Sequence, residues 1–236
     1  MHPKVLIVIP CFNEEQSLPK LLGSLKQYIS KSEYDIKPVV INDCSKDGTA
    51  VVAKSLGVTV LDLPNNLGIG GAVQTGIKYA LYNGYDYSIQ MDGDGQHPPS
   101  ELAKLINTAI ETQADVVIGS RFLTGEGFQS TYIRRMGIKY FHFLNKLLTG
   151  RRVYDITSGY RLLGKKAIAI AASYYPDDYP EPESLVVYAR AGLKIVEVPV
   201  IMNERQGGKS SIGALASVYY WVKVTAAMLY SYIRKQ

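Results

Sequence analysis

Two carboxylates separated by one glycine, Asp92 and Asp94, carry the clearest chemistry in this sequence. They follow an apolar run over 85–91 that predicts a buried strand, and Gly93 permits a sharp turn at little steric cost. With the amide oxygen of Gln96, the two carboxylates make a donor set suited to Mg²⁺ or Mn²⁺. Because Mg²⁺ in proteins is usually shared between carboxylates and substrate phosphates, the turn predicts a metal site for a phosphorylated ligand.

Other interpretations of these polar segments can be tested on the sequence. An EF-hand loop starting at Asp92 is excluded, because its twelfth position is Ala103 and not glutamate. The dinucleotide fingerprint fails at its sixth position, Val73, after Gly68 and Gly70, and no P-loop pattern occurs. A polar turn that binds no ion remains open, since turns are rich in Asp and Gly.

The segments around this turn alternate between predicted strands and helices. Strands are expected over 4–9, 36–42, 58–63, 85–91 and 115–119, and helices over 16–29, 49–56, 72–82 and 99–112. This alternation predicts an α/β fold with a mostly parallel central sheet and helices on both faces. In such sheets, ligands bind outside the carboxyl ends of the strands. Polar or glycine-rich loops follow four of these ends, at 10–15, 42–49, 65–71 and 92–96, so we expect one site there.

Composition sets broad limits on the class of protein. With 236 residues, 47% of them hydrophobic and 20% charged, the chain is globular and not disordered. A net charge of +5 suits a partner that carries phosphates or an acidic membrane surface, although it is also an ordinary charge for solubility. Only two cysteines occur, Cys11 and Cys44, which favours a reducing cytosolic setting. We expect no signal peptide, because the amino-terminal residues lead directly into a strand.

Several motifs together resemble family 2 glycosyltransferases, which have the GT-A fold, a Rossmann-like α/β architecture. The matching segments are 8–15, 41–47, 66–72 and the D-x-D motif at 92–94. Segments 119–121, 155–161 and 205–210 resemble the branch that contains dolichyl- and polyprenyl-phosphate sugar synthases. The resemblance covers about residues 4–212. It implies transfer of a sugar, as by a hexosyltransferase, from a nucleotide-sugar with inversion at the anomeric carbon.

The resemblance and the residue types together imply a role for each matching position. The donor would be a sugar linked to UDP, GDP or dTDP. Its nucleotide would contact Pro10, Phe12, Asn13, Glu14, Asp43, Gly70, Asp92 and Gly93. Asp92, Asp94 and Gln96 would hold Mg²⁺ or Mn²⁺. The acceptor or its phosphate would contact Arg121, Arg134, Ser158, Arg205, Lys209 and Ser210. Direct catalytic roles would fall to Asp94, Glu183 and Arg205.

Some of these residues have a second interpretation. Asp43 sits in a polar cluster before a helix and fits a capping residue, and Glu14 fits an acid in the first turn of a helix. Glu183 precedes a helix predicted over 184–191, where many inverting relatives place a base. A lipid phosphate is already ionised and needs no base, so Glu181 and Glu183 would then orient the sugar or simply favour a helix amino terminus.

Two segments in the second half predict amphipathic helices. Residues 132–148 place apolar side chains at helical spacing opposite a basic face, which fits either a helix on an anionic membrane or one packed on the sheet. Residues 214–233 are rich in aromatic side chains, with Lys223 at their centre. A central lysine costs about 2.5–3.5 kcal/mol on insertion scales, so we expect this helix to lie in the interface or to pack on the domain. The predicted division is a catalytic domain over 1–212 and this helix over 213–236.

The sequence and the resemblance therefore predict a metal-dependent, inverting glycosyltransferase of cell wall polysaccharide biosynthesis. We expect it to be cytoplasmic and peripheral at the inner face of the cell membrane, with a polyprenyl phosphate or a lipid-linked saccharide as acceptor and no nucleic acid partner. A transferase that extends a polysaccharide on a sugar hydroxyl, a sugar nucleotidyltransferase and a non-catalytic adaptor are the alternatives. Homo-oligomerisation stays open.

Overall fold

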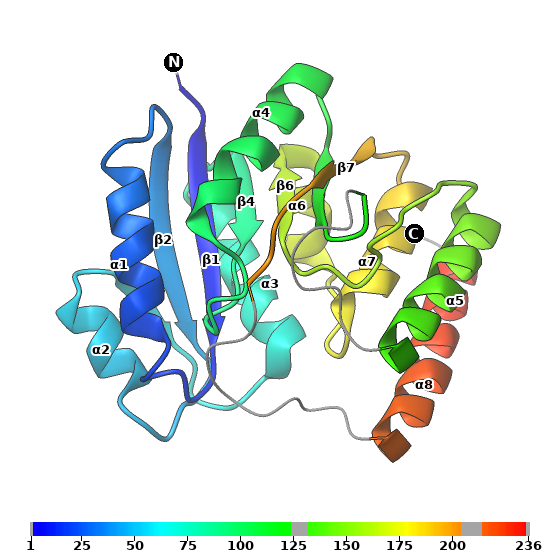
Figure 1. The fold of residues 1–236 in the computed structure, drawn as a ribbon, viewed down its shortest axis with the longest axis horizontal. Helices are drawn as coiled ribbons and strands as arrows, with labels where there is room; N and C mark the ends of the chain where they lie inside the picture. The colour runs from blue at the N-terminus through cyan, green and yellow to red at the C-terminus, as the bar shows by residue number, and fades with distance from the viewer. Residues whose placement is uncertain (1, 124–131, 204–213, 235–236) are drawn as a thin grey trace.

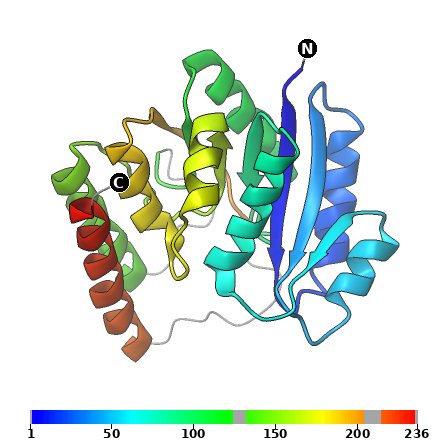
Figure 2. The ribbon, with the colours of Figure 1, turned by 180° about the vertical axis from the view of Figure 1, so that it is seen from behind.

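The computed structural model describes residues 2–123, 132–203 and 214–234. In these residues the chain forms one central sheet with helices on both of its faces (Figures 1 and 2). The predicted α/β architecture with a mostly parallel sheet is confirmed.

Seven strands make up this sheet in the described residues, in the order β3-β2-β1-β4-β6-β5-β7. They are β1 Lys4–Cys11, β2 Asp35–Asn42, β3 Thr59–Asp62, β4 Tyr87–Gln90, β5 Val116–Ser120, β6 Arg161–Gly164 and β7 Ile195–Pro199. Neighbours pair in parallel except β6, which is antiparallel to β4 and β5. Cys11 pairs with Asn42, and Val8 pairs with Gln90. The loops after β1, β2 and β4 therefore leave the sheet at the same edge.

Successive apolar side chains of the strands point to opposite faces of the sheet, so helices pack on both faces. The helices are α1 Leu18–Ile29, α2 Thr49–Ser55, α3 Gly68–Tyr82, α4 Leu102–Thr112, α5 Tyr132–Thr149, α6 Lys165–Ser173, α7 Pro180–Arg190 and α8 Ala214–Ile233, with a 3₁₀ turn at Pro99–Glu101. In β1, Val5, Ile7 and Ile9 pack in one core with α1 and α4. Leu6 and Val8 point to the other face, where they pack in a second core with α3 and α6.

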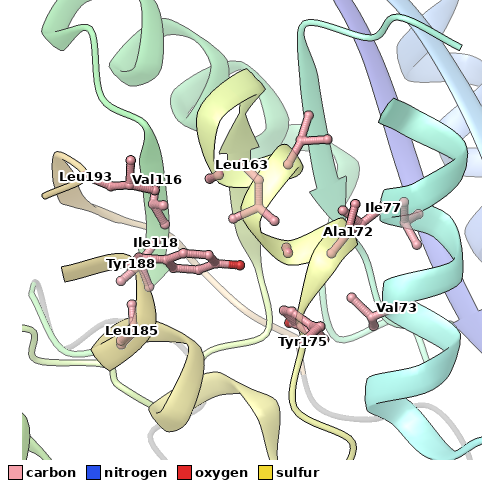
Figure 3. Close-up of a cluster of buried hydrophobic side chains, with 14 of the residues drawn as sticks. Val73, Ile77, Val116, Ile118, Leu163, Ala172, Tyr175, Leu185, Tyr188 and Leu193 are labelled. Atoms are coloured by element: carbon pink, nitrogen blue, oxygen red, sulfur yellow. The ribbon is translucent and has the colours of Figure 1, made fainter. Parts of the chain in front are cut away.

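The second core also fixes α7 against the sheet. Figure 3 shows Val116 and Ile118 of β5 and Leu163 of β6 close to Leu185 and Tyr188 of α7. All five side chains are buried. This packing sets the position of the first turn of α7, which carries two acidic residues.

The carboxyl-terminal helix α8 packs against α5 and α7, and the two views show α5 and α8 side by side (Figures 1 and 2). Val224 and Met228 of α8 are buried, and the ring of Trp221 stacks on Tyr140 of α5 with 5.9 Å between ring centroids. The helix predicted over 214–233 is thus confirmed, and it packs on the domain. Within the described ranges no helix combines the length and the apolar character needed to cross a bilayer. The predicted division between 212 and 213 falls outside the described residues.

Two predicted helix starts were wrong. The glycines predicted to form a turn over 65–71 are partly helical, because α3 begins at Gly68. Helix α7 begins at Pro180 and not at 184, so Glu181 and Glu183 both lie in its first turn. Proline at the first helical position is a recognised start signal, since its missing N–H would be unpaired there in any case.

Gly76 marks a close approach of α3 to β1, because a Cβ there would lie 2.2 Å from Cγ1 of Val8. We expect Gly76→Ala to lower the free energy of unfolding by about 1–3 kcal/mol, although alanine is the better helix former. Urea denaturation measures this change.

Gly23 of α1 is the matched control, since it also lies inside a helix and has no atom within 4 Å of its Cβ position. Gly23→Ala should raise the free energy of unfolding by about 0.5–1 kcal/mol. Equal stabilisation by both substitutions would contradict the close packing of α3 on β1.

Candidate active site

Asn13 joins the loops that follow β1 and β2. Its N–H donates to the hydroxyl of Ser45 at 3.0 Å, and its Oδ1 accepts from the N–H of Lys46 at 2.8 Å. Asn13 has a φ of 57°, which asparagine adopts more readily than most residues. The neighbouring ring of Phe12 is 47% exposed. This edge therefore presents an aromatic face, and nucleoside binding by Phe12 and Asn13 stays a prediction.

Pro10 and Glu14, both predicted to contact the nucleotide, lie in the loop between β1 and α1 or at its edge. Pro10 is buried near the end of β1. The N–H of Glu14 donates to Oγ1 of Thr49 at 2.9 Å, and its carboxylate accepts a hydrogen bond from the hydroxyl of Ser17. The carbonyl of Glu14 accepts from the N–H of Leu18, the first residue of α1. Glu14 thus lies before the N-cap Ser17, and the first turn of α1 holds no acidic residue. The interpretation of Glu14 as a first-turn acid was therefore wrong, and nucleoside binding by Glu14 stays a prediction.

Asp43 caps α3, and not α2, the helix that follows its own loop and for which the sequence suggested a capping role. Its buried carboxylate accepts from the N–H groups of Leu67 and Gly68, at 2.7 and 3.0 Å. These bonds explain why the helix begins among glycines. Each carboxylate oxygen keeps a second lone pair, so a nucleoside contact of Asp43 stays a prediction beside its capping role.

Gly70 allows two backbone segments to approach each other. Its N–H donates to the carbonyl of Asp177 at 3.0 Å, and a Cβ at this position would lie 2.0 Å from the carbonyl oxygen of Pro176. Only glycine fits this packing. The N–H of Gly70 already has its partner, so the structure gives this residue a packing role, and its predicted contact with the donor nucleotide stays a prediction.

The acidic turn directly follows β4. Oδ1 of Asp92 accepts from Nε2 of Gln90 at 3.0 Å, and Oδ1 of Asp94, which is 2% exposed, accepts from the N–H of Gln96 at 3.0 Å. Gly93 packs so closely that a Cβ there would lie 2.8 Å from Sγ of Cys11. The turn is therefore held tightly against the end of β1, with both carboxylates at the expected edge.

His97 fixes this turn, although its sequence pattern predicted no role for it. The N–H of Asp92 donates to Nδ1 of His97 at 3.1 Å, and the imidazole stacks on the ring of Tyr160 with 4.6 Å between centroids. Because Nδ1 is an acceptor, the proton of the neutral ring lies on Nε2, which is 3.8 Å from Oδ2 of Asp92. A histidine three residues after a D-x-D motif is the signal that could have indicated this contact.

The donor set of the turn fits a hard divalent cation. Asp92, Asp94 and Gln96 supply oxygen donors only, which suits Mg²⁺ or Mn²⁺. Among the described residues, no group of three or more His, Cys, Asp and Glu side chains gathers as a closed metal site. Two carboxylates that leave the remaining coordination positions to phosphates and water are the usual Mg²⁺ arrangement.

Arg121 forms a buried ion pair. Its Nε and Nη2 donate to the two carboxylate oxygens of Asp155 at 2.8 and 2.7 Å, and its backbone N–H donates to the same carboxylate at 3.0 Å. Burial lowers the pKa of the Arg121 guanidinium, but Asp155 outweighs it, so the pKa is raised overall. Arg121 therefore anchors the loop of Asp155, and the predicted phosphate contact is not its main interaction.

The same loop is tied to β7 and to β5. Oε1 and Oε2 of Glu197 accept from the N–H groups of Asp155 and Tyr154, each at 2.8 Å. Burial raises the pKa of Glu197, and these bonds partly offset that effect. Oγ of Ser158 donates to the carbonyl of Gly119 at 2.6 Å. Ser158, predicted to contact the acceptor, is thus buried and supports the loop.

Glu181 and Glu183 point to different sides of α7. Oε1 of Glu183 accepts from the hydroxyls of Tyr174 and Ser231, each at 2.6 Å, and Ser231 belongs to α8. Glu183 lines a cavity of about 430 Å³ between residues 174–179 and α8. Glu181 instead lies beside Gly159. The structure therefore brings Glu181, and not the predicted Glu183, toward the acidic turn.

Four predicted residues cannot be placed. Arg205, Lys209 and Ser210 lie outside the described residues, and for Arg134 only the helical backbone of α5 is described. The described chain leads to the first three through Asn203, whose N–H donates to the carbonyl of Gln96 at 3.0 Å. Asn203, the last described residue before these three, therefore lies beside the acidic turn.

Comparison with known proteins decides the family. The sequence profile described as Glycosyl transferase family 2 matches residues 6–169. The chain belongs to glycosyl transferase family 2. It is therefore a glycosyltransferase, and the nucleotidyltransferase alternative no longer applies.

Individual relatives place the chain more closely. It is 34% identical over 218 residues to the undecaprenyl-phosphate mannosyltransferase of Micrococcus luteus, over 89% of this chain and 87% of that protein. It is 30% identical over 219 residues to the polyprenol monophosphomannose synthase of Mycolicibacterium smegmatis, over 89% and 81% of the two chains. The resemblance to polyprenyl-phosphate sugar synthases is thus confirmed.

A solved structure shows the same fold. Glucosyl-3-phosphoglycerate synthase from Mycobacterium tuberculosis, in complex with Mn²⁺, UDP-glucose and phosphoglyceric acid, matches with a TM-score of 0.76 and 16% identity. The match covers 99% of this chain and 81% of that one. This likeness confirms the GT-A fold.

The Arg121–Asp155 pair should be essential for stability. Asp155→Asn leaves the buried guanidinium without a counter-charge, so we expect the free energy of unfolding to fall by about 3–5 kcal/mol in chemical denaturation. The control is Lys37→Gln, which removes the exposed pair with Asp35 at 3.9 Å and should change stability by at most about 1 kcal/mol. Similar small losses in both variants would contradict the role of the buried pair.

Proposed function

We propose that this glycosyltransferase is inverting and dependent on a divalent metal ion, and that it moves a sugar from a nucleotide-sugar to a polyprenyl phosphate at the cytoplasmic face of the membrane. The observation that carries the proposal is the acidic turn, in which Asp92, Asp94 and Gln96 offer oxygen donors. This turn is held at the edge where the loops after β1 and β2 leave the sheet. The names of the two relatives, both polyprenyl-phosphate mannosyltransferases, support a lipid-linked acceptor.

On the donor side, the chain's own residues bind and orient. The exposed ring of Phe12 offers a stacking face for a base, and Asp43 can accept from a nucleoside while it caps α3. Asp92, Asp94 and Gln96 would hold Mg²⁺ or Mn²⁺, which would neutralise the charge on the departing diphosphate. His97 keeps the turn in place through the N–H of Asp92.

On the acceptor side, the surroundings of Glu183 favour an acceptor that needs no general base, such as a polyprenyl phosphate. A phosphate oxygen is already ionised and attacks without a general base, whereas a sugar hydroxyl needs one. The Glu183 carboxylate, the predicted base, is held by Tyr174 and Ser231. We therefore favour the phosphate acceptor over the polysaccharide-extending alternative, with Arg205, Lys209 and Ser210 as the proposed phosphate contacts.

The surface of α5 and α8 supports a peripheral place at the membrane. Phe143 and Leu147 of α5 are 64% and 68% exposed, and Val222 and Ile233 of α8 are 66% and 73% exposed. The two helices meet at Tyr140, whose hydroxyl is 3.1 Å from that of Thr225. Exposed lysines at 139 and 146 of α5 add positive charge. Apolar side chains flanked by basic ones favour an anionic lipid surface.

Donor binding can be tested by a thermal-shift panel of UDP-, GDP- and dTDP-sugars, with and without Mn²⁺. A ligand at about 100 times its dissociation constant stabilises the folded state by roughly 2.7 kcal/mol, so we expect one nucleotide class to raise the Tm by about 5–10 °C. The shift should require Mn²⁺ and disappear in Asp94→Ala.

Asp35→Asn is the control, because this exposed carboxylate lies at the opposite end of β2 from the site. It should keep the full shift. If no nucleotide-sugar shifts the wild type, or if Asp94→Ala keeps the shift, the metal-dependent donor site is refuted.

Membrane binding can be tested by sedimentation with vesicles that contain phosphatidylglycerol. We expect the double substitution Phe143→Gln and Leu147→Gln to weaken binding at least tenfold, because each buried large apolar side chain contributes about 1.5–3 kcal/mol. The matched control replaces Val51 and Leu56 near α2, which are 71% and 40% exposed, with glutamine. Equal losses in both double variants, or no binding by the wild type, would argue against this surface.

A further inference from the structure

The cavity between residues 174–179 and α8 has an aromatic lining. Its volume of about 430 Å³ is within the range of pockets that bind small ligands. Four tyrosine side chains, from the loop between α6 and α7 and from α8, line it: Tyr174, Tyr175, Tyr179 and Tyr230. The cavity therefore offers several aromatic faces to a small ligand.

The charge of this lining is negative. The carboxylates of Asp177, Asp178 and Glu183 line the cavity, together with the single ammonium group of Lys223. Asp177 and Asp178 are exposed, and Asp178 is paired with Lys223. Glu183 is the buried member of the set, with 7% of its surface exposed. Although the whole chain carries a net charge of +5, this cavity favours a cationic ligand over an anionic one.

Glu183 lacks a counter-charge. Its Oε1 accepts from the hydroxyls of Tyr174 and Ser231, each at 2.6 Å, and none of the described residues donates to its Oε2. Within the described chain, no lysine, arginine or histidine forms an ion pair with this carboxylate. The guanidinium of Arg234 instead lies over the ring of Tyr174, 4.6 Å from its centre. Because a buried carboxylate is costly without a cation, its unpaired oxygen marks a place for a ligand's positive charge.

The kind of cation follows from these features. Aromatic faces attract ammonium groups in general. A carboxylate oxygen with an unused lone pair also accepts a hydrogen bond, and a primary ammonium group has N–H donors whereas a quaternary one has none. We propose that this cavity binds a primary ammonium group, which donates to the Glu183 carboxylate and is surrounded by the tyrosine rings. An ethanolamine lipid headgroup and a free small amine both carry this group.

The walls of the cavity suggest what its occupant does. Tyr230 of α8 lines it and is 57% exposed, so the cavity reaches the surface of the helix proposed to meet the membrane. The other wall packs on the start of α3, where the N–H of Gly70 donates to the carbonyl of Asp177 at 3.0 Å. A bound ammonium group would hold α8 against this loop. The inference does not depend on which sugar is transferred or on its acceptor.

Isothermal titration with ethanolamine tests the site, and choline, which has no N–H, is the matched probe. We expect wild type to bind ethanolamine with a dissociation constant on the order of 1 mM, since the ligand is very small, and choline about tenfold or more weakly. Glu183→Gln should weaken ethanolamine binding about tenfold or more. The control is Glu111→Gln, an exposed carboxylate of α4, which should leave the affinity unchanged.

A second variant separates the loss of the site from a loss of folding. Ala227 of α8 lines the cavity and makes none of the hydrogen bonds of Glu183. Ala227→Phe fills the space proposed for the ammonium group, so it should also abolish ethanolamine binding. Urea denaturation shows whether each variant is folded. If Glu183→Gln does not fold, Ala227→Phe decides.

Vesicles distinguish the two sources of the group. They contain equal phosphatidylglycerol, with either phosphatidylethanolamine or phosphatidylcholine. Tighter binding of wild type to the ethanolamine vesicles, lost in Ala227→Phe, would assign a lipid headgroup, and equal binding to both would assign a free amine. The proposal is overturned if wild type binds no ethanolamine, if choline binds equally well, or if the folded variants keep wild-type affinity. A failure of the nucleotide-sugar panel would refute the donor site and leave this cavity untouched.

Discussion

A buried ion pair at the carboxyl edge of the sheet, between Arg121 and Asp155, is the constraint on which the site depends. Asp155 accepts three hydrogen bonds from Arg121 and so holds its loop across the end of β5. That loop ends at Tyr160, on which His97 stacks, and His97 accepts the N–H of Asp92. The charge pair is therefore linked to the orientation of the acidic turn through its loop, Tyr160 and His97.

The same loop also holds α7, whose two first-turn acidic residues point to different sides. Its carbonyl of Ser158 and the carbonyl of Glu181 share the guanidinium of Arg161, which docks the helix on the loop. Residues two positions apart on a helix point about 200° apart. Glu181 can thus lie beside Gly159 while Glu183 is enclosed with α8. One helix turn thereby contacts the loop of Gly159 on one side and the carboxyl-terminal helix on the other.

The sequence predicted the parts of this structure that depend on local patterns. The apolar run over 85–91 and the carboxylates after it specify a strand end with an acidic turn, and parallel neighbours place the other loops at the same edge. Pairings between distant residues were not predictable in this way. The charge of Arg121 suggested a phosphate ligand, but its partner is Asp155, 34 positions away. The four-residue strand β6 is too short for its periodicity to indicate a strand, or an antiparallel one.

The most direct test of the central claim is product analysis. The protein is incubated with undecaprenyl phosphate and each nucleotide-sugar, with Mn²⁺ or with EDTA, and the lipid fraction is analysed by mass spectrometry. We expect one donor to yield a lipid whose mass has increased by one sugar, formed with Mn²⁺ and absent with EDTA, and the NMR spectrum of this product should show an inverted anomeric configuration. A product formed equally well in EDTA, or sugar transfer only to a hydroxyl acceptor, would contradict a metal-dependent synthase of polyprenyl-phosphate sugars.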